Sequence, residues 1–200
     1  MIRTLRHLSR RAGDGERGAV AVEAALITPI LITLVFGIVD FSLLLKDYVG
    51  AVSATRAGAR TASAEPHQTS FLTDTAAQMT RATANLNRDS TTSLWIYRVP
   101  GGSSGAPPAT CNADANCVPF SWNGTAFVSA DLGNWPASAV NACPLSATNP
   151  SGPDAVGVRL TTPHNFLTPI WKGSFTIDDK AVLNFEPVPL GVSGTGCAAS

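Results

Sequence analysis

The sequence predicts an α+β fold, in which a long amino-terminal membrane-spanning helix continues into an exported stem and precedes a small, mostly antiparallel sheet. An apolar run is nearly unbroken from residue 19 to 45, and helical spacing of small residues continues to about residue 64. Short β-branched and aromatic runs, separated by Gly, Pro and Asn, then predict strands. The expected parts are a basic cytoplasmic leader (1–18), a transmembrane helix (19–45), a helical stem (46–65) and an extracytoplasmic α+β domain with disulfide-closed loops (66–200).

The charges of the chain are balanced overall but unevenly distributed. Before Gly18 there are five arginines and two acidic residues, a net charge of +3, and the rest of the chain carries −3. A basic amino end followed by an apolar run favours a cytoplasmic amino terminus and an extracytoplasmic remainder. Zero net charge gives no reason to expect a nucleic-acid partner.

Two carboxylates, Glu23 and Asp40, lie within the apolar run. The uncharged segment between them has only 16 residues, whereas a membrane span needs about 20. The two acids are 17 residues apart, roughly 26 Å along a helix, slightly less than the hydrocarbon core. We therefore expect a single-pass helix with at least one acid near an interface and residues beyond about 46 outside.

A cleaved secretory signal peptide is the alternative interpretation of this run. Its apolar region usually has about 7–15 residues and ends in a small-residue cleavage site. Here the run is longer and has no A-x-A site at its end, although the small residues of "SATRAGARTASA" leave a later site open.

Helical periodicity extends beyond the apolar run. We expect one helix over 19–64, ended by Glu65-Pro66 because the residue before proline is disfavoured in a helix. A second helix is predicted in "SFLTDTAAQMTRATANL". In the stem, one stripe of residues recurs at spacings of three and four: Leu44, Tyr48, Ala51, Val52, Thr55, Ala59 and Ala62. A second, polar stripe consists of Ser53, Arg56, Arg60 and Ser63. The expected buried face of the second helix consists of Phe71, Ala76, Met79, Thr83 and Leu86.

Four segments of the remaining chain are typical of strands. Residues 93–100 are aromatic and β-branched, and Asn123-Gly124 between apolar flanks indicates a hairpin turn. Residues 155–166 and 175–188 predict two more strands.

All four cysteines, Cys111, Cys117, Cys143 and Cys197, lie in the part expected outside. An even number in an oxidising compartment indicates two disulfides, and the sequence allows three connectivities. Cys111–Cys117 with Cys143–Cys197 is the simplest, because it closes a short loop and ties down the tail. Without a CxxC pair we expect no metal site, and no motif indicates a cofactor.

Catalytic groups are hard to find in the exported part. Its only histidines, His67 and His164, lie in no recognisable motif, and Asp178-Asp179 is interpreted as a turn before a strand. The tryptophans, Trp95, Trp122, Trp135 and Trp171, are expected to fill the core rather than a sugar site. The sequence therefore predicts no catalytic residue and no small-molecule substrate; an anchored envelope enzyme is the weakest alternative.

Glu23 is the residue that most needs an explanation. A carboxylate near the centre of a span costs roughly 2.5–3.5 kcal/mol on insertion scales, unless it lies at the headgroups. Gly18 stands five residues earlier, so cleavage after it would make Ala19 a new amino terminus one helical turn from Glu23. The carboxylate could then pair with that ammonium, or with that of an adjacent subunit, and act as a docking charge.

The amino-terminal segment resembles the TadE-like proteins, pseudopilin-like components of tight adherence (Tad/Flp) pilus systems. The resemblance rests on "RGAVAVEAALITPILITLVFGIVDFSLLL" followed by "SATRAGARTAS". The matching features are Gly18, Val22-Glu23, Ala25-Leu26, Pro29 and the segment from Arg56 to Arg60.

The resemblance implies a pilin-like fold in the cytoplasmic membrane and cleavage of the Gly18–Ala19 bond by a membrane-embedded prepilin peptidase. It also implies other Tad subunits and the secretion machinery as partners, in pilus assembly or export. Pro29 either marks a tolerated kink or loosens the helix for packing during assembly. A membrane-anchored binding module without a pilus role remains the main alternative.

Overall fold

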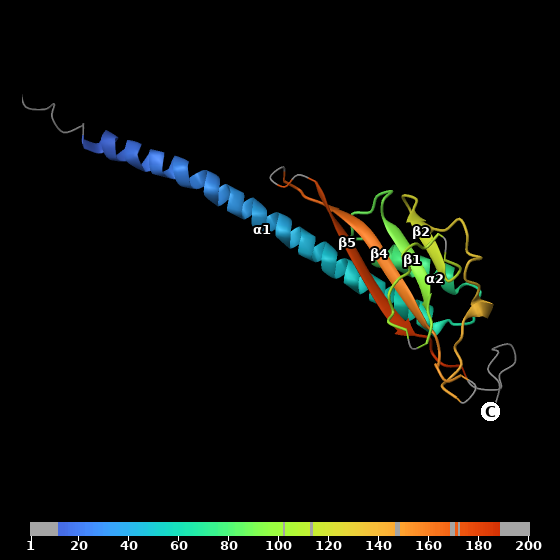
Figure 1. Ribbon diagram of the computed structural model, residues 1–200. Coiled ribbons are helices and arrows are strands. Elements are labelled where there is room, and N and C mark those ends of the chain that lie inside the picture. Colours follow the sequence, from blue (N-terminus) through green and yellow to red (C-terminus); the bar gives the residue numbers. More distant parts are fainter. Residues whose placement is uncertain are drawn as a thin grey trace, which may run out of the picture. The chain divides into compact units, whose positions relative to one another are not determined.

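The computed structural model describes residues 12–101, 103–112, 114–146, 149–168, 171 and 173–188 (Figure 1). The chain divides into two compact units. Unit 1 comprises Met1–Leu43 and Phe166–Lys172, and unit 2 comprises Leu44–Asn165 and Gly173–Ser200. Cys197 lies outside the described residues, so its predicted pairing with Cys143 stays a prediction.

Two α-helices form the helical part of the fold. Helix α1 spans Ala12–Ala64 and α2 spans Phe71–Ala82. The predicted end of α1 before Glu65-Pro66 is confirmed, and at its amino-terminal end α1 extends beyond the expected start at about residue 19 to Ala12. Residues 12–18 contain glycines but no proline, so no residue there lacks the N–H that a helix needs.

The strands form one five-stranded sheet in unit 2, and every pairing in it is antiparallel, as predicted. The order across the sheet is β3-β2-β1-β4-β5, so β1 is the central strand and lies between β2 and β4 (Figure 1). The strands are β1 (Ser93–Val99), β2 (Cys117–Trp122), β3 (Phe127–Val128), β4 (Ala155–Asn165) and β5 (Ser174–Asn184), with a 3₁₀ turn at Ala137–Ala139.

The predicted hairpin turn at Asn123-Gly124 connects β2 to β3. The Asn123 side chain accepts hydrogen bonds from the backbone N–H groups of Thr125 and Ala126 at 2.9 and 2.8 Å. Gly124 has φ +101°, a conformation that side chains with a Cβ rarely adopt. The turn chemistry that the sequence indicates therefore fixes this hairpin.

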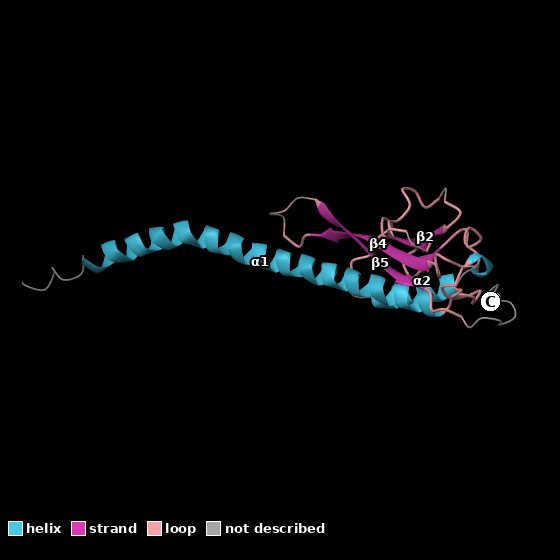
Figure 2. Ribbon diagram, turned by 60° about the horizontal axis from the view of Figure 1, so that its bottom comes forward, coloured by secondary structure: helices cyan, strands magenta, loops and turns pink. Residues whose placement is uncertain are grey.

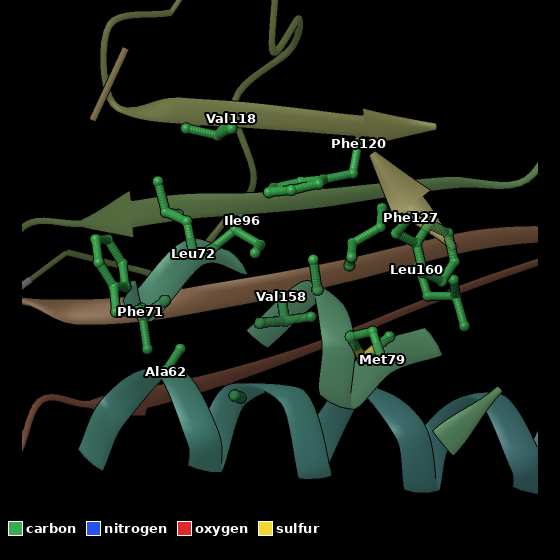
Figure 3. Close-up of a cluster of buried hydrophobic side chains, with 14 of the residues drawn as sticks. Ala62, Phe71, Leu72, Met79, Ile96, Val118, Phe120, Phe127, Val158 and Leu160 are labelled. Atoms are coloured by element: carbon green, nitrogen blue, oxygen red, sulfur yellow. The ribbon is translucent and has the colours of Figure 1, made fainter. Parts of the chain in front are cut away.

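Helix α2 and the carboxyl-terminal part of α1 cover one face of the sheet in unit 2 (Figure 2). Figure 3 shows side chains from both helices and from the strands meeting in a single layer of buried hydrophobic groups. All five residues predicted to form the buried face of the second helix are buried. They are Phe71, Ala76, Met79, Thr83 and Leu86.

Small residues let the stem approach the rest of this core closely. A Cβ added to Gly58 would lie 2.6 Å from Met79 Sδ and 3.4 Å from Val158 Cγ1. Of the stem residues that recur at helical spacing, Ala51, Thr55, Ala59 and Ala62 are buried, whereas Tyr48 is 48% exposed. In the polar stripe, Ser63 is buried, and its hydroxyl donates a hydrogen bond to the Arg60 carbonyl.

Asp178 and Asp179 lie inside β5, so their interpretation as a turn is wrong. Asp178 accepts two hydrogen bonds from Arg159 on β4, at 2.8 and 2.6 Å, and Asp179 accepts one from Thr55 at 2.5 Å. The hydrogen bond from Arg159 lowers the pKa of Asp178. Cross-strand and helix partners, which sequence spacing does not reveal, keep two adjacent acids in a strand.

The opposite face of the sheet carries a smaller buried cluster under the loop that ends at β2. Tyr97 lies within it, and burial raises the pKa of Tyr97 to about 12. Cys111 and Cys117 form a disulfide in this cluster. Tyr97 pairs with Gly157 across β1 and β4, and a Cβ on Gly157 would lie 2.2 Å from the Tyr97 ring. The loop therefore packs on the Tyr97 ring, and this ring has room only because the residue that pairs with it, Gly157, has no side chain.

We predict that Gly157→Ala lowers the free energy of unfolding by about 2 kcal/mol, because the added methyl group overpacks a rigid ring. Chemical denaturation of the full chain in detergent checks this value. In a Tyr97→Leu background the same substitution should cost clearly less. An equal cost in both backgrounds would show that the Tyr97 ring is not the constraint.

Candidate functional site

The predicted processing and docking residues, Gly18, Ala19, Glu23 and Pro29, all lie on α1 in unit 1, and all are exposed. Nearly every residue from 18 to 39 is exposed, although most of them are apolar. Within the described residues, this is the one helix long and apolar enough to cross a membrane, with a mean hydropathy of 2.3. A helix that is apolar all round and uncovered needs an apolar environment.

The Gly18–Ala19 bond lies within a helix rather than in an extended segment. A Cβ added to Gly18 would have nothing within 4 Å, so the bond is accessible from outside. Glycine costs about 1 kcal/mol relative to alanine in a helix interior, which favours local unwinding at this position. Position 18 of α1 is therefore accessible, and the helix is easier to unwind there than it would be with alanine.

Glu23 lies four residues after Ala19, one turn along the same face of α1. Its carboxylate is exposed and makes no hydrogen bond or ion pair with other parts of the chain that the structure describes. Glu23 thus has no internal partner there, and its acceptor oxygens are free to bind a group outside this chain.

Helix α1 continues through Pro29. Proline has no N–H, so the carbonyl of Ala25 loses its usual helical partner. Nearby hydroxyls bond within the helix: Thr28 donates to the Ala24 carbonyl at 2.6 Å, and Thr33 donates to the Pro29 carbonyl at 2.8 Å. The hydroxyl groups of this segment are therefore satisfied without any neighbour, which suits an apolar environment.

Asp40, the second acid of the apolar run, differs from Glu23 both in its burial and in its hydrogen bonding. It is 1% exposed, and its oxygens accept hydrogen bonds from the backbone N–H of Leu167, at 2.9 Å, and from the Thr168 hydroxyl. Leu167 and Thr168 belong to the β4–β5 loop and to the same unit as Asp40. Sequence spacing gives no signal for this contact, because the partners are more than 120 residues apart.

The histidines considered for catalysis lie in unit 2. His164 is 3% exposed, and its Nδ1 lies 2.7 Å from Asp47 Oδ2 of α1. This pair ties β4 to the helix rather than facing a cleft. Among the described residues, no group of His, Cys, Asp and Glu could hold a metal ion.

Comparison with known proteins gives one result for the helix and none for the rest of the chain. No curated protein and no solved structure matches. A family model described as TadE-like protein matches residues 18–60. The matched segment begins at Gly18, includes Glu23 and Pro29, and ends at Arg60. Residues 18–60 of this chain therefore form a TadE-like helix, in agreement with the resemblance that the sequence shows.

Proposed function

We propose that this chain is a membrane-anchored, pseudopilin-like component of a tight adherence pilus system and that it supports pilus assembly or export without catalytic activity. The observation that carries the proposal is the TadE-like match over residues 18–60, on a helix whose apolar residues are uncovered. Anchoring in the cytoplasmic membrane, with unit 2 outside, follows from the basic leader and the length of the apolar run.

Processing after Gly18 is the first step of the proposed mechanism. The bond is accessible, and glycine weakens the helix around it, so a membrane-embedded peptidase can unwind the first turns and cut at the cytoplasmic face. Removal of residues 1–18 leaves α1 in the membrane with a charged amino group at Ala19.

Docking through Glu23 is the second step. The carboxylate is costly in an apolar environment when it is alone, and it has no partner among the described residues of its own chain. The ammonium of Ala19 on this chain or on an adjacent subunit neutralises it, and that pairing favours assembly over the isolated chain.

Mass spectrometry should find a mature chain that begins at Ala19 when the protein is produced with the cognate prepilin peptidase. Gly18→Leu should block this cleavage, since a large side chain then stands beside the bond to be cut, at a position where an added Cβ meets nothing in this protein. Gly37→Ala is the matched control, because its added Cβ also has open space, and it should be processed normally. Only full-length chains, or chains that start beyond residue 46, would reject processing at this site.

Glu23→Gln should leave membrane insertion intact and reduce assembly with partner subunits by at least roughly tenfold, the lower range for close charge pairs across an interface. Co-purification with the other pilus subunits and the amount of surface pili measure the effect. Glu16→Gln is the control, since it also removes one negative charge but lies in the discarded leader. Unchanged pilus output in Glu23→Gln would remove the docking role.

A further inference from the structure

The contact between Asp40 and the β4–β5 loop fixes that loop at one level of α1. Both carboxylate oxygens of Asp40 accept hydrogen bonds from consecutive residues of the loop, one from the Leu167 N–H at 2.9 Å and one from the Thr168 hydroxyl. Asp40 and Thr168 are both buried by the contact. The loop is therefore bound to the helix at the carboxyl-terminal end of the segment that runs from Glu23 to Asp40.

The same loop presents large apolar side chains outward. Leu167 is 71% exposed and Trp171 is 55% exposed. The Trp171 ring lies beside that of Phe166, with 6.2 Å between the ring centroids. An exposed tryptophan next to an exposed leucine is unexpected on a loop in water, and the expectation that all four tryptophans fill the core is wrong for Trp171.

We propose that the β4–β5 loop is a second membrane contact, in which Leu167 and Trp171 enter the outer interface of the bilayer that α1 crosses. Tryptophan is enriched at this depth because its ring is apolar and its N–H can bond headgroups or water. The partner is thus the lipid surface around the span, and the loop acts as an interfacial anchor.

The surface of α1 next to the contact supports lipid as the occupant. Val39 and Phe41, on either side of Asp40 in sequence, are 40% and 65% exposed. Ile38 and Phe36, the latter one turn before Asp40, are also exposed. The Leu167 N–H and the Thr168 hydroxyl hold the loop against this helix. The medium that surrounds the apolar helix at this level therefore also contacts the loop. The loop contact and the span thereby form one continuous apolar surface.

The contact with the β4–β5 loop also explains how a carboxylate is tolerated at position 40. An acid at the edge of a bilayer is costly unless it is hydrogen-bonded, and the loop supplies donors to both of its oxygens. Asp40 is therefore a positioning residue that holds Leu167 and Trp171 at the interface. This inference rests on the membrane anchoring in the proposed function, but not on the pilus role.

Fluorescence quenching in lipid nanodiscs tests the proposal. The full chain is reconstituted at one copy per disc, with lipids brominated either near the headgroups or near the acyl-chain ends. We expect the headgroup-proximal bromines to quench the protein more strongly, and Trp171→Phe to lose most of that quenching. Trp95→Phe is the matched control, because Trp95 lies on the sheet under Arg159, and its quenching should match that of the parent chain.

A second pair of variants tests the role of Asp40. Thr168→Val keeps the side-chain volume but removes the hydroxyl donor, and Asp40→Ala removes both acceptors. Both should reduce quenching of Trp171, with the larger loss in Asp40→Ala, while the far-ultraviolet circular dichroism of the full chain stays unchanged. Quenching equal to that of the parent in both variants would overturn the positioning role.

The outcomes of these experiments distinguish a contact with lipid from a contact with a second copy of the chain. A chain that enters the discs but shows equal quenching with and without Trp171 overturns this inference and leaves the pilus role standing. A Trp171 signal that changes only when two copies share a disc assigns the loop to a second copy and also overturns it. Failure to enter the discs would reject the anchoring on which both proposals rest.

Discussion

The structure depends on one constraint: the two halves of helix α1 require different environments. Between residues 18 and 39, α1 exposes apolar side chains on all sides, which water disfavours by roughly 25 cal/mol for each Å². Beyond residue 50 the same helix buries alanines and Gly58 against α2 and the sheet. The first half fits lipid and the second half fits a compact domain, so we infer that α1 is both the anchor of the domain and part of its core.

The two acids of the apolar segment have different surroundings, and our account therefore gives them different roles. Asp40 is satisfied by the β4–β5 loop of its own chain, whereas the Glu23 carboxylate makes no hydrogen bond or ion pair with other described residues. A buried carboxylate with two donors stabilises the chain that holds it, while an unpaired one favours a complex that supplies a cation. In our account, Asp40 therefore positions the protein in the membrane and Glu23 recruits its neighbour.

Local signals predicted much of this fold from sequence. Pro66 ends α1, and Asn123-Gly124 forms the β2–β3 turn. Met79 lies on the periodic buried face of α2. Contacts between distant segments escaped prediction, because neither the pairing of Asp178 with Arg159 nor that of Asp40 with the loop has a periodic pattern. For the candidate site, the spacing of Gly18 and Glu23 in the sequence predicts a processing and docking role that stays a prediction, and the sequence gives no signal for the loop residues that satisfy Asp40.

The exposed lysines allow the most direct test of the claim that α1 crosses the membrane with unit 2 outside. Lys46 and Lys180 are exposed in unit 2, on the carboxyl-terminal side of the apolar segment. A membrane-impermeant amine reagent is applied to right-side-out and to inside-out vesicles, and mass spectrometry locates the label. The account predicts label on Lys46 and Lys180 in right-side-out vesicles alone. Label on both lysines in sealed inside-out vesicles would contradict it.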